Sequence, residues 1–390
     1  MLELIVTAMV AGGDGLARHP DGRVVFVEGG LPGERVGVSV TEERRDFLRA
    51  TVVDVVDASA DRLTPPCPER ARGCGGCPWQ HIAVGAQPRL KAGIVQDALR
   101  RLAHIEPAVT VGPTAVAAAY RTTVRLAVDR AGRPSYRPRR GHDNIAVDTC
   151  LVAHPRLEDL IVSSRFLGGR DVVLRVGAAT GERLAWPRPR VQRAEVAADV
   201  QVVRGRGGHI HDVVAGRTWR ISAGSFFQAG PAAAEALIAG VARSVGSAPA
   251  VHLVDAYCGV GLLGGALAAS RPGLRVTAVE SDAVAGADAE ANLADVDALV
   301  VKTEVARLQI RAADVVVADP ARTGLGRSAS RALAATGAPL LVLVSCDPAS
   351  LARDAGLLRE LGYGLESVEV VDLFPHTFQV ETVSRFLRQS

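Results

Sequence analysis

Lysine is almost absent from this 390-residue sequence, because only Lys91 and Lys302 occur among its 45 lysine and arginine residues. Arginine offers a planar fork that suits phosphates and base edges, but GC-rich coding produces the same bias, so the bias identifies no partner. The formal net charge of +3 is also too small to indicate a nucleic-acid-binding protein by itself. Composition therefore leaves the binding partner open.

Long apolar runs are absent as well. The sequence has no run of about eighteen uncharged apolar residues, so it predicts no membrane-spanning helix. It also has no basic-then-apolar leader, which predicts a cytoplasmic location and no membrane partner. The hydrophobic content of 48% is typical of a globular protein, and the length predicts roughly two or three domains.

The six cysteines indicate metal binding or catalysis, because an intracellular protein rarely uses cysteine in disulfides. The segment Cys74-Gly-Gly-Cys77 can place two thiolates on one centre, and its glycines let the backbone fold tightly around a metal. Cys67 is the nearest further ligand, and Cys150 is the remaining candidate for a fourth. An iron–sulfur cluster and a zinc ion both suit this spacing, so both alternatives stay open.

The first 58 residues alternate between short β-branched runs and glycine turns. Strands are expected at residues 3–9, 22–27, 34–40 and 50–56. Short strands at regular spacing predict a small closed β-barrel of OB-like type. Arg44, Arg45 and Arg49 on this barrel either contact RNA phosphates or are simply solvated.

The middle of the chain begins with a predicted helix over residues 80–104, which has apolar residues at helical spacing. From residue 109 to residue 219 the pattern is mostly β. A loop in this part combines an aromatic ring with basic residues, namely Tyr136 with Arg133, Arg137, Arg139 and Arg140. Such a loop can hold single-stranded RNA by stacking and phosphate contact, and an ordinary exposed loop is the alternative.

From about residue 219 the pattern changes to alternating β and α. A strand ending at Asp255 leads into a glycine loop with Gly259 and Gly261, and the next strand ends at Glu280, which is placed for a ribose diol. This opening suits either a dehydrogenase or a methyltransferase. Asp255 would repel a pyrophosphate and suits the cationic sulfonium and amino groups of S-adenosylmethionine, so the pattern favours a methyltransferase.

The apolar run at residues 340–344 predicts an inner strand of a parallel sheet, and Cys346 follows it before the Asp347-Pro348 turn. Ligands of open α/β sheets bind at the carboxyl ends of the strands. Cys346 is therefore either a nucleophile facing that crevice or a small, inert buried cysteine.

These motifs together resemble the uracil-5 RNA methyltransferases, which add a methyl group to C5 of uridine in ribosomal or transfer RNA. The similarity extends over nearly the whole chain. The matching segments are residues 22–27 and 31–36, Cys67, Cys74-Gly-Gly-Cys77, Cys150, Tyr120-Arg121, Ser225-Phe-Phe-Gln228, the loop from Asp255 to Gly261, Asp319-Pro-Ala-Arg322, Ser345-Cys-Asp-Pro348, Leu351-Ala-Arg-Asp354, Phe374-Pro-His-Thr377 and Val380-Glu381.

The resemblance implies a multidomain chain. An N-terminal OB-like TRAM barrel would occupy residues 1–58, and a central, mostly-β domain with an iron–sulfur cluster would occupy residues 59–220. A C-terminal α/β, Rossmann-like methyltransferase domain would occupy residues 221–390, with the helix at 80–104 packed on it. The implied ligands of the [4Fe-4S] cluster are Cys67, Cys74, Cys77 and Cys150, with zinc as the alternative metal.

The resemblance also implies a mechanism. A Cys346 thiolate would add to C6 of the uracil so that C5 can attack the methyl group, and Glu381 would then remove the C5 proton. Residues matching the family's S-adenosylmethionine contacts are Gln228, Tyr257, Glu280 and Asp319. The expected substrate is 23S ribosomal RNA, with transfer RNA second, and a monomer is expected. A catalytically weak RNA-binding or iron–sulfur protein on the same scaffold is the rival.

Three residues depart from the family pattern near the implied cofactor and base. Gly230 stands where asparagine is common, Leu262 stands where asparagine or threonine is common, and Gln379 replaces a usual histidine. None of them removes a chemical role that can be named, but together they affect the expected geometry of cofactor binding.

Overall fold

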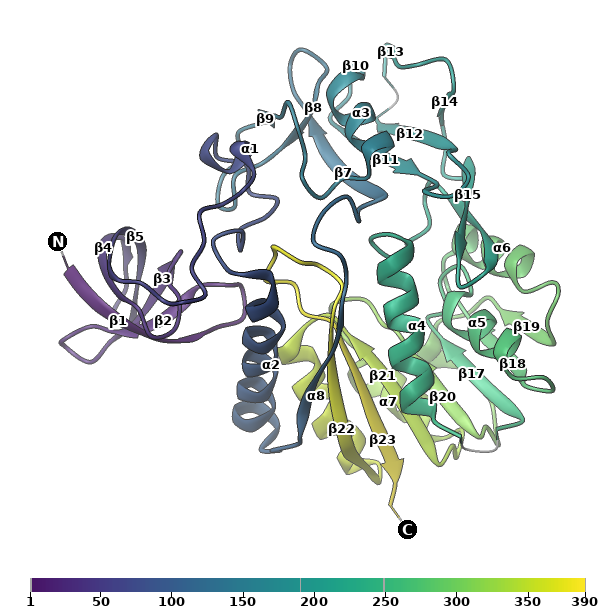
Figure 1. The fold of residues 1–390 in the computed structure, drawn as a ribbon. Coiled ribbons are helices and arrows are strands. Elements are labelled where there is room, and N and C mark those ends of the chain that lie inside the picture. Colours follow the sequence, from purple (N-terminus) through teal and green to yellow (C-terminus); the bar gives the residue numbers. More distant parts are fainter. Residues whose placement is uncertain (1, 190, 248–249, 390) are drawn as a thin grey trace.

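The computed structural model describes residues 2–189, 191–247 and 250–389. Three β-rich parts follow one another along the chain: a small barrel, a central sheet, and a large sheet with helices on both faces (Figure 1). Among the described residues no helix is long and apolar enough to cross a membrane. The fold thus has the three-part order that the sequence predicts.

The N-terminal barrel is closed, with the strand order β1-β2-β3-β5-β4. Alternate side chains of each strand point inward, so that Val6, Val25, Val36 and Ala50 form a buried core. The strands are β1 (Leu2–Met9), β2 (Gly15–Arg18), β3 (Val24–Glu28), β4 (Arg35–Glu43) and β5 (Phe47–Asp57). The sequence did not predict β2, because its four residues lie directly after a cluster of glycines.

A helical segment links the barrel to the remainder of the chain. It contains α1 (Pro68–Ala71), the 3₁₀ turn η1 (Val84–Ala86), α2 (Gln87–Ala98) and the π turn η2 (Leu99–Ala103). The helix predicted over residues 80–104 therefore begins later, since Cys77–Ile82 is folded as turns and Pro88 lies in the first turn of α2. Apolar residues of this helix, including Val95 and Leu99, pack beneath the large sheet.

The central part holds a six-stranded sheet with the order β14-β12-β11-β7-β8-β9. Its strands are β7 (Thr123–Val128), β8 (Pro134–Tyr136), β9 (Ile145–Ala146), β11 (Asp171–Val176), β12 (Arg183–Arg188) and β14 (Val200–Val202). Helix α3 (Pro155–Ser163) packs on β11, and β10 (Arg165–Leu167) pairs with β13 (Arg193–Glu195). The hairpin of β15 (His209–Val214) and β16 (Arg217–Ser222) leads into the last part.

The large sheet has the order β19-β18-β17-β20-β21-β23-β22-β6. Its strands are β17 (His252–Ala256), β18 (Arg275–Val279), β19 (Ala298–Val301), β20 (Val315–Ala318), β21 (Leu340–Ser345), β22 (Tyr363–Asp372), β23 (Thr382–Arg388) and β6 (Val109–Thr114). Strands β17 to β21 are parallel, as in other doubly wound folds, and β23 runs antiparallel to β21.

Helices cover both faces of this sheet (Figure 1). One face packs against α4 (Pro231–Val245), α5 (Leu262–Ser270) and α6 (Ala283–Asn292). The other packs against α2, α7 (Gly326–Ala334) and α8 (Pro348–Glu360), with the 3₁₀ turn η3 (Val305–Arg307) beside α7. Strand β6 and helix α2 thus come from residues 59–220 but complete the sheet and helical layer of residues 221–390. The sequence predicted this packing for the helix and missed it for β6.

Candidate active site

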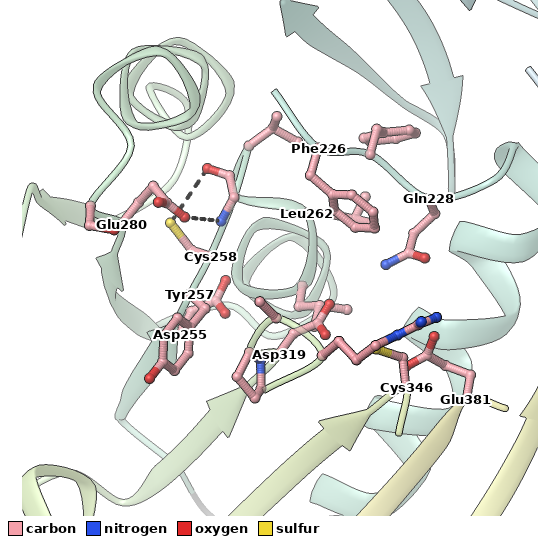
Figure 2. A pocket seen from close by; sticks show the side chains of 18 of the residues that line it. Phe226, Gln228, Asp255, Tyr257, Cys258, Leu262, Glu280, Asp319, Cys346 and Glu381 are labelled. Carbon is pink, nitrogen blue, oxygen red and sulfur yellow. Dashed lines mark hydrogen bonds between the residues drawn. The ribbon is translucent and has the colours of Figure 1, made fainter. Parts of the chain in front are cut away.

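The glycine loop after β17 is held by two carboxylates from the ends of neighbouring strands. Asp255 is fully buried, and its Oδ2 accepts a hydrogen bond from the Gly264 N–H at 2.8 Å. Glu280 accepts the Gly259 N–H at 3.0 Å (Figure 2). It also accepts the Asp282 N–H at 2.7 Å. The loop between these strands is therefore fixed before any ligand binds.

Asp255 lies deeper than the sequence suggested. Burial is the main cause that raises its pKa to about 7, and the nearby carboxylates of Asp319 and Glu280 act in the same direction. Its Oδ1 is buried and has no hydrogen-bond partner among the described residues, and Asp255 is one of the residues that line the cavity described below. Asp255 thus holds the glycine loop through the hydrogen bond from Gly264 to its Oδ2, while its Oδ1 has no partner within the described residues.

A cavity of about 690 Å³ opens at the carboxyl ends of β17, β20 and β21. All six residues that the sequence singled out for catalysis or cofactor contact line it: Gln228, Tyr257, Glu280, Asp319, Cys346 and Glu381 (Figure 2). They come from six separate segments of the chain, and the doubly wound topology brings them together at one edge of the sheet. Their individual roles remain predictions.

The acidic end of the cavity holds two carboxyl groups, of which Glu381 is buried and Asp319 is partly buried. Burial raises the pKa of Asp319 to about 7. Burial also raises the pKa of Glu381 well above its usual range, and Asp319 raises it further, whereas the cations of Arg322 and Lys91 oppose this shift. Each of the two carboxyl groups therefore disfavours ionisation of the other.

Cys346 follows β21, whose six residues are all buried, and its own side chain is half-buried against the cavity. Burial raises the pKa of the thiol to about 11, and the carboxylates of Glu381 and Asp319 raise it while Arg322 lowers it. Asp347 begins α8, where its side chain accepts the Ser350 N–H at 2.8 Å. The thiol is therefore accessible from the cavity but held mainly as a thiol.

Two residues of this site were missed as functional candidates, although both lie inside motifs read from the sequence. The positive charge of Arg322 lowers the pKa of both Cys346 and Glu381. Its Nη2 donates a hydrogen bond to Gln379 Oε1 at 2.8 Å. Phe226 lines the cavity with 69% of its surface exposed. An arginine after Asp319-Pro-Ala and an aromatic residue before Gln228 were the available signals.

The three departures from the family pattern have local explanations. A Cβ added at Gly230 would lie 2.0 Å from the Tyr120 carbonyl oxygen, so no side chain fits there without movement. Leu262 lines the cavity and contributes apolar surface at the start of α5. Gln379 accepts the hydrogen bond from Arg322. Each residue is therefore consistent with its neighbours in this chain.

The four predicted metal ligands lie around a second, smaller cavity of about 30 Å³. Cys67, Cys74, Cys77 and Cys150 all line it, and the Tyr136 hydroxyl lies 3.2 Å from the Cys150 sulfur. Within the described ranges, however, no group of three or more histidine, cysteine or acidic residues is arranged to hold a metal ion. The cysteines are thus gathered as predicted, while neither the iron–sulfur cluster nor zinc is shown.

Two of the four arginines in the arginine-rich loop bind acidic residues of the barrel, whereas Arg133 and Arg137 are exposed. Arg139 and Arg140 pair with Asp14 of the barrel at 2.7 and 2.5 Å. Tyr136 is partly buried, and its hydroxyl lies 3.2 Å from the Cys150 sulfur. This loop mainly fastens the barrel to the central sheet, because its charges meet acidic residues of the barrel.

Known proteins share this architecture. Residues 2–53 match the TRAM domain family. An RNA methyltransferase of uncharacterized function from Streptomyces avermitilis is 37% identical over 98% of this chain and 97% of its own length. A second such protein, from Corynebacterium glutamicum, is 31% identical over 97% of this chain and 95% of its own.

A solved structure shares the fold over the whole chain. The tRNA (uracil-54, C5)-methyltransferase of Pyrococcus abyssi, crystallised with S-adenosyl-L-homocysteine, superposes with a TM-score of 0.72. The match covers 99% of this chain and 100% of that one, at 22% sequence identity. The order of barrel, central sheet and large sheet is therefore common to both proteins.

Proposed function

The chain belongs to the RNA methyltransferases that carry an N-terminal TRAM domain, and from this premise we propose that it methylates C5 of a uridine in RNA. The methyl donor is S-adenosylmethionine. One observation carries the proposal: a cysteine thiol, a buried carboxyl group and a glycine loop with its acidic partner all line the same cavity. A methyltransferase acting on a stronger nucleophile than C5 has no need of that thiol.

Residues on one side of the cavity suit the donor. Glu280 has lone pairs left for ribose hydroxyls after accepting two backbone N–H groups, and the Gln228 side-chain oxygen is buried without a partner among the described residues. Tyr257 and Asp319 complete the proposed contacts. When bound, S-adenosylmethionine supplies an electrophilic methyl group, and the acidic lining favours its positive charge.

Residues on the other side suit the uracil. C5 is too weak a nucleophile to attack the methyl group unaided. The Cys346 thiol therefore first loses its proton to solvent, and the thiolate then forms a bond to C6. Electron density moves to C5 and the O4 carbonyl, and C5 can then take the methyl group. Arg322 supports this step because its positive charge favours the thiolate.

The last step restores the ring. Glu381, as a carboxylate, takes the proton from C5, the S–C6 bond breaks, and the sulfur leaves as a thiolate. Burial makes an ionised Glu381 a strong base, since its pKa lies well above the usual value. Burial raises the pKa of Asp319 to about 7, so its protonated form is accessible and can donate a hydrogen bond to a uracil carbonyl oxygen.

The substrate uridine has to leave its stack to reach Cys346. Phe226, exposed at the cavity, offers a surface for a base. Further away, the exposed Arg125, Arg137 and Arg170 surround a groove of about 410 Å³ on the central sheet, which suits the phosphate backbone. These features support RNA as the substrate.

The four gathered cysteines support a [4Fe-4S] cluster, with zinc as the alternative metal. Four thiolates suit either centre, and all four cysteines line the same small cavity. A bound cluster would supply a structural cross-link between the segment of Cys67–Cys77 and Cys150. Iron and sulfide analysis of anaerobically purified protein tests this assignment, and stoichiometric zinc without sulfide would reject it.

We propose 23S ribosomal RNA as the substrate. Transfer RNA is the second candidate, and the fold shared with the tRNA methyltransferase of Pyrococcus abyssi favours this second candidate. Mapping of 5-methyluridine in both RNAs from cells lacking the gene separates them. Loss from 23S RNA alone supports the first, and loss from transfer RNA alone supports the second. Unchanged 5-methyluridine in both would reject the proposed activity and favour a catalytically weak RNA-binding protein.

A further inference from the structure

Lys91, one of only two lysines, is completely buried within α2. Its Nζ donates to Asp372 Oδ1 at 2.7 Å and to the Phe374 carbonyl oxygen at 3.1 Å, and it lies 5.8 Å from the centre of the Trp79 ring. Asp372 is equally buried. The other lysine, Lys302, forms an exposed pair with Glu290.

A buried ion pair is a poor device for stability alone, because removing two charges from water costs about as much as their attraction returns. Its presence therefore calls for a reason beyond packing. The ammonium group here has an acceptor or a ring face for each of its three N–H directions, so its orientation is defined. What the pair orients is the segment that follows β22.

That segment, residues 373–381, leads directly to Glu381. Asp372 Oδ1 also accepts the Phe374 N–H at 3.2 Å, so lysine and aspartate together fix both polar backbone groups of Phe374. Further along, His376 has a left-handed φ of 66°. At the far end, the Val371 N–H bonds the Glu381 carbonyl at 2.9 Å and closes the segment.

The strained His376 is held by the same helical segment that holds Phe374. Its N–H donates to Gln87 Oε1 at 2.6 Å, and its carbonyl accepts the Trp79 N–H at 2.9 Å. Gln87 lies one helical turn before Lys91 on α2. A non-glycine residue with positive φ persists only where its surroundings impose it, so α2 and the preceding turn determine the path to Glu381.

Lys91 also acts on Glu381 through its charge. Four ionisable groups surround the Glu381 carboxyl: Asp319 after β20, Arg322 on the following turn, Cys346 after β21, and Lys91 on α2. Asp319 disfavours the carboxylate form, and the thiol is uncharged below its own pKa. Arg322 and Lys91 are the two cations that favour the carboxylate.

We propose that Lys91 is a positioning residue for proton abstraction: it fixes the backbone path to Glu381 and supplies a positive charge that keeps this carboxyl able to ionise. The inference rests on the proposed function. It predicts a defect confined to the last step, after the thiol has added to C6 and the methyl group has been transferred.

The test measures two rates on a uridine-containing RNA: formation of the covalent enzyme–RNA adduct and its breakdown to methylated RNA. Lys91→Met should leave formation within about 3-fold of wild type, and it should slow breakdown by ~10–100-fold, since misplaced catalytic groups lose rates of this order. The adduct should then accumulate on denaturing gels. Lys302→Met, which removes the exposed lysine, is the matched control and should behave as wild type.

The pH dependence gives a second readout that loss of packing alone does not move. Breakdown requires ionised Glu381, so it falls at low pH. Removing a cation raises the pKa of Glu381 further, and the acid limb of the breakdown rate should move to higher pH in Lys91→Met. Lys91→Arg keeps the positive charge but changes the shape of the side chain. In this variant the acid limb should return close to its wild-type pH, whereas the breakdown rate should recover less.

A variant that fails to fold does not end the test. In Lys91→Met/Asp372→Asn neither partner is left as an unpaired buried charge, and the asparagine oxygen still accepts the Phe374 N–H. This double variant should fold, accumulate adduct and keep the shifted acid limb. The proposal would be overturned if either folded variant had the wild-type breakdown rate and the wild-type acid limb. Equal losses in the rates of adduct formation and adduct breakdown would also overturn it. Wild-type protein that forms no adduct would instead reject the proposed function.

Discussion

The Arg322 guanidinium donates a hydrogen bond to Gln379 at 2.8 Å, and this contact holds a cation beside both the Cys346 thiol and Glu381. Gln379 occupies the position two residues before Glu381 where the family pattern has histidine. A single arginine thus favours the ionised forms of two groups, and the proposed mechanism uses each of these forms in a different step.

Replacing Arg322 should change the pH dependence of the thiol. The pKa of Cys346 is already raised to about 11, and Arg322 is the group that lowers it. Arg322→Met should therefore raise this pKa further, and at a fixed pH below it each added unit reduces the thiolate fraction about tenfold. Iodoacetamide alkylation of Cys346 followed against pH measures the shift. Arg322→Lys keeps a charge as the control, and an unchanged alkylation profile in Arg322→Met would contradict this role.

Glu381→Gln should separate the steps of the reaction. Glutamine has nearly the shape of glutamate but cannot take a proton, so the thiol still adds and the methyl group is still transferred. The covalent RNA adduct should accumulate, and turnover should fall by about 10²–10⁴-fold, the range usual for loss of a general base. Denaturing gels and steady-state methylation measure the two effects. Full turnover by this variant would remove Glu381 from the mechanism.

Gly230→Ala should destabilise the protein. The added methyl group would lie 2.0 Å from the Tyr120 carbonyl oxygen, and Gly230 precedes α4 in the buried interior. Overpacking of this kind costs about 1–3 kcal/mol of the free energy of unfolding. Gly93 in α2 is exposed and has no atom within 4 Å of an added Cβ, so Gly93→Ala should instead stabilise by about 0.5–1 kcal/mol. Urea unfolding compares the two, and equal effects would refute the steric explanation.

The sequence predicted well those parts that depend on local pattern. The apolar run before Cys346 predicted β21, and the alternation of β and α predicted the doubly wound sheet. The six predicted site residues line one cavity because each follows a strand or lies in a recognisable motif. Glu381, however, was found only through the resemblance, since a lone glutamate near the end of a sequence has no local signature.

Contacts between distant segments could not be predicted. Pairing of β6 with β22 joins residues more than 250 positions apart, as in Val109 with Val368, and no pattern in β6 specifies its partner. For Arg139 and Arg140 the sequence left RNA contact and an ordinary exposed loop as alternatives, because arginines look alike until the acidic residue that pairs with them is placed. Lys91 shows the same limit, because its partners follow it by more than 280 residues.

The proposed mechanism requires that the Cys346 sulfur bonds to C6 of the substrate uracil. The most direct measurement is mass spectrometry of peptides after reaction of the enzyme with S-adenosylmethionine and RNA containing 5-fluorouridine, which blocks removal of the C5 substituent. The proposed mechanism predicts a stable adduct of methylated fluorouridine on Cys346, and this adduct should be absent from Cys346→Ala. An unmodified Cys346 in enzyme that fully methylates uridine-containing RNA would contradict it.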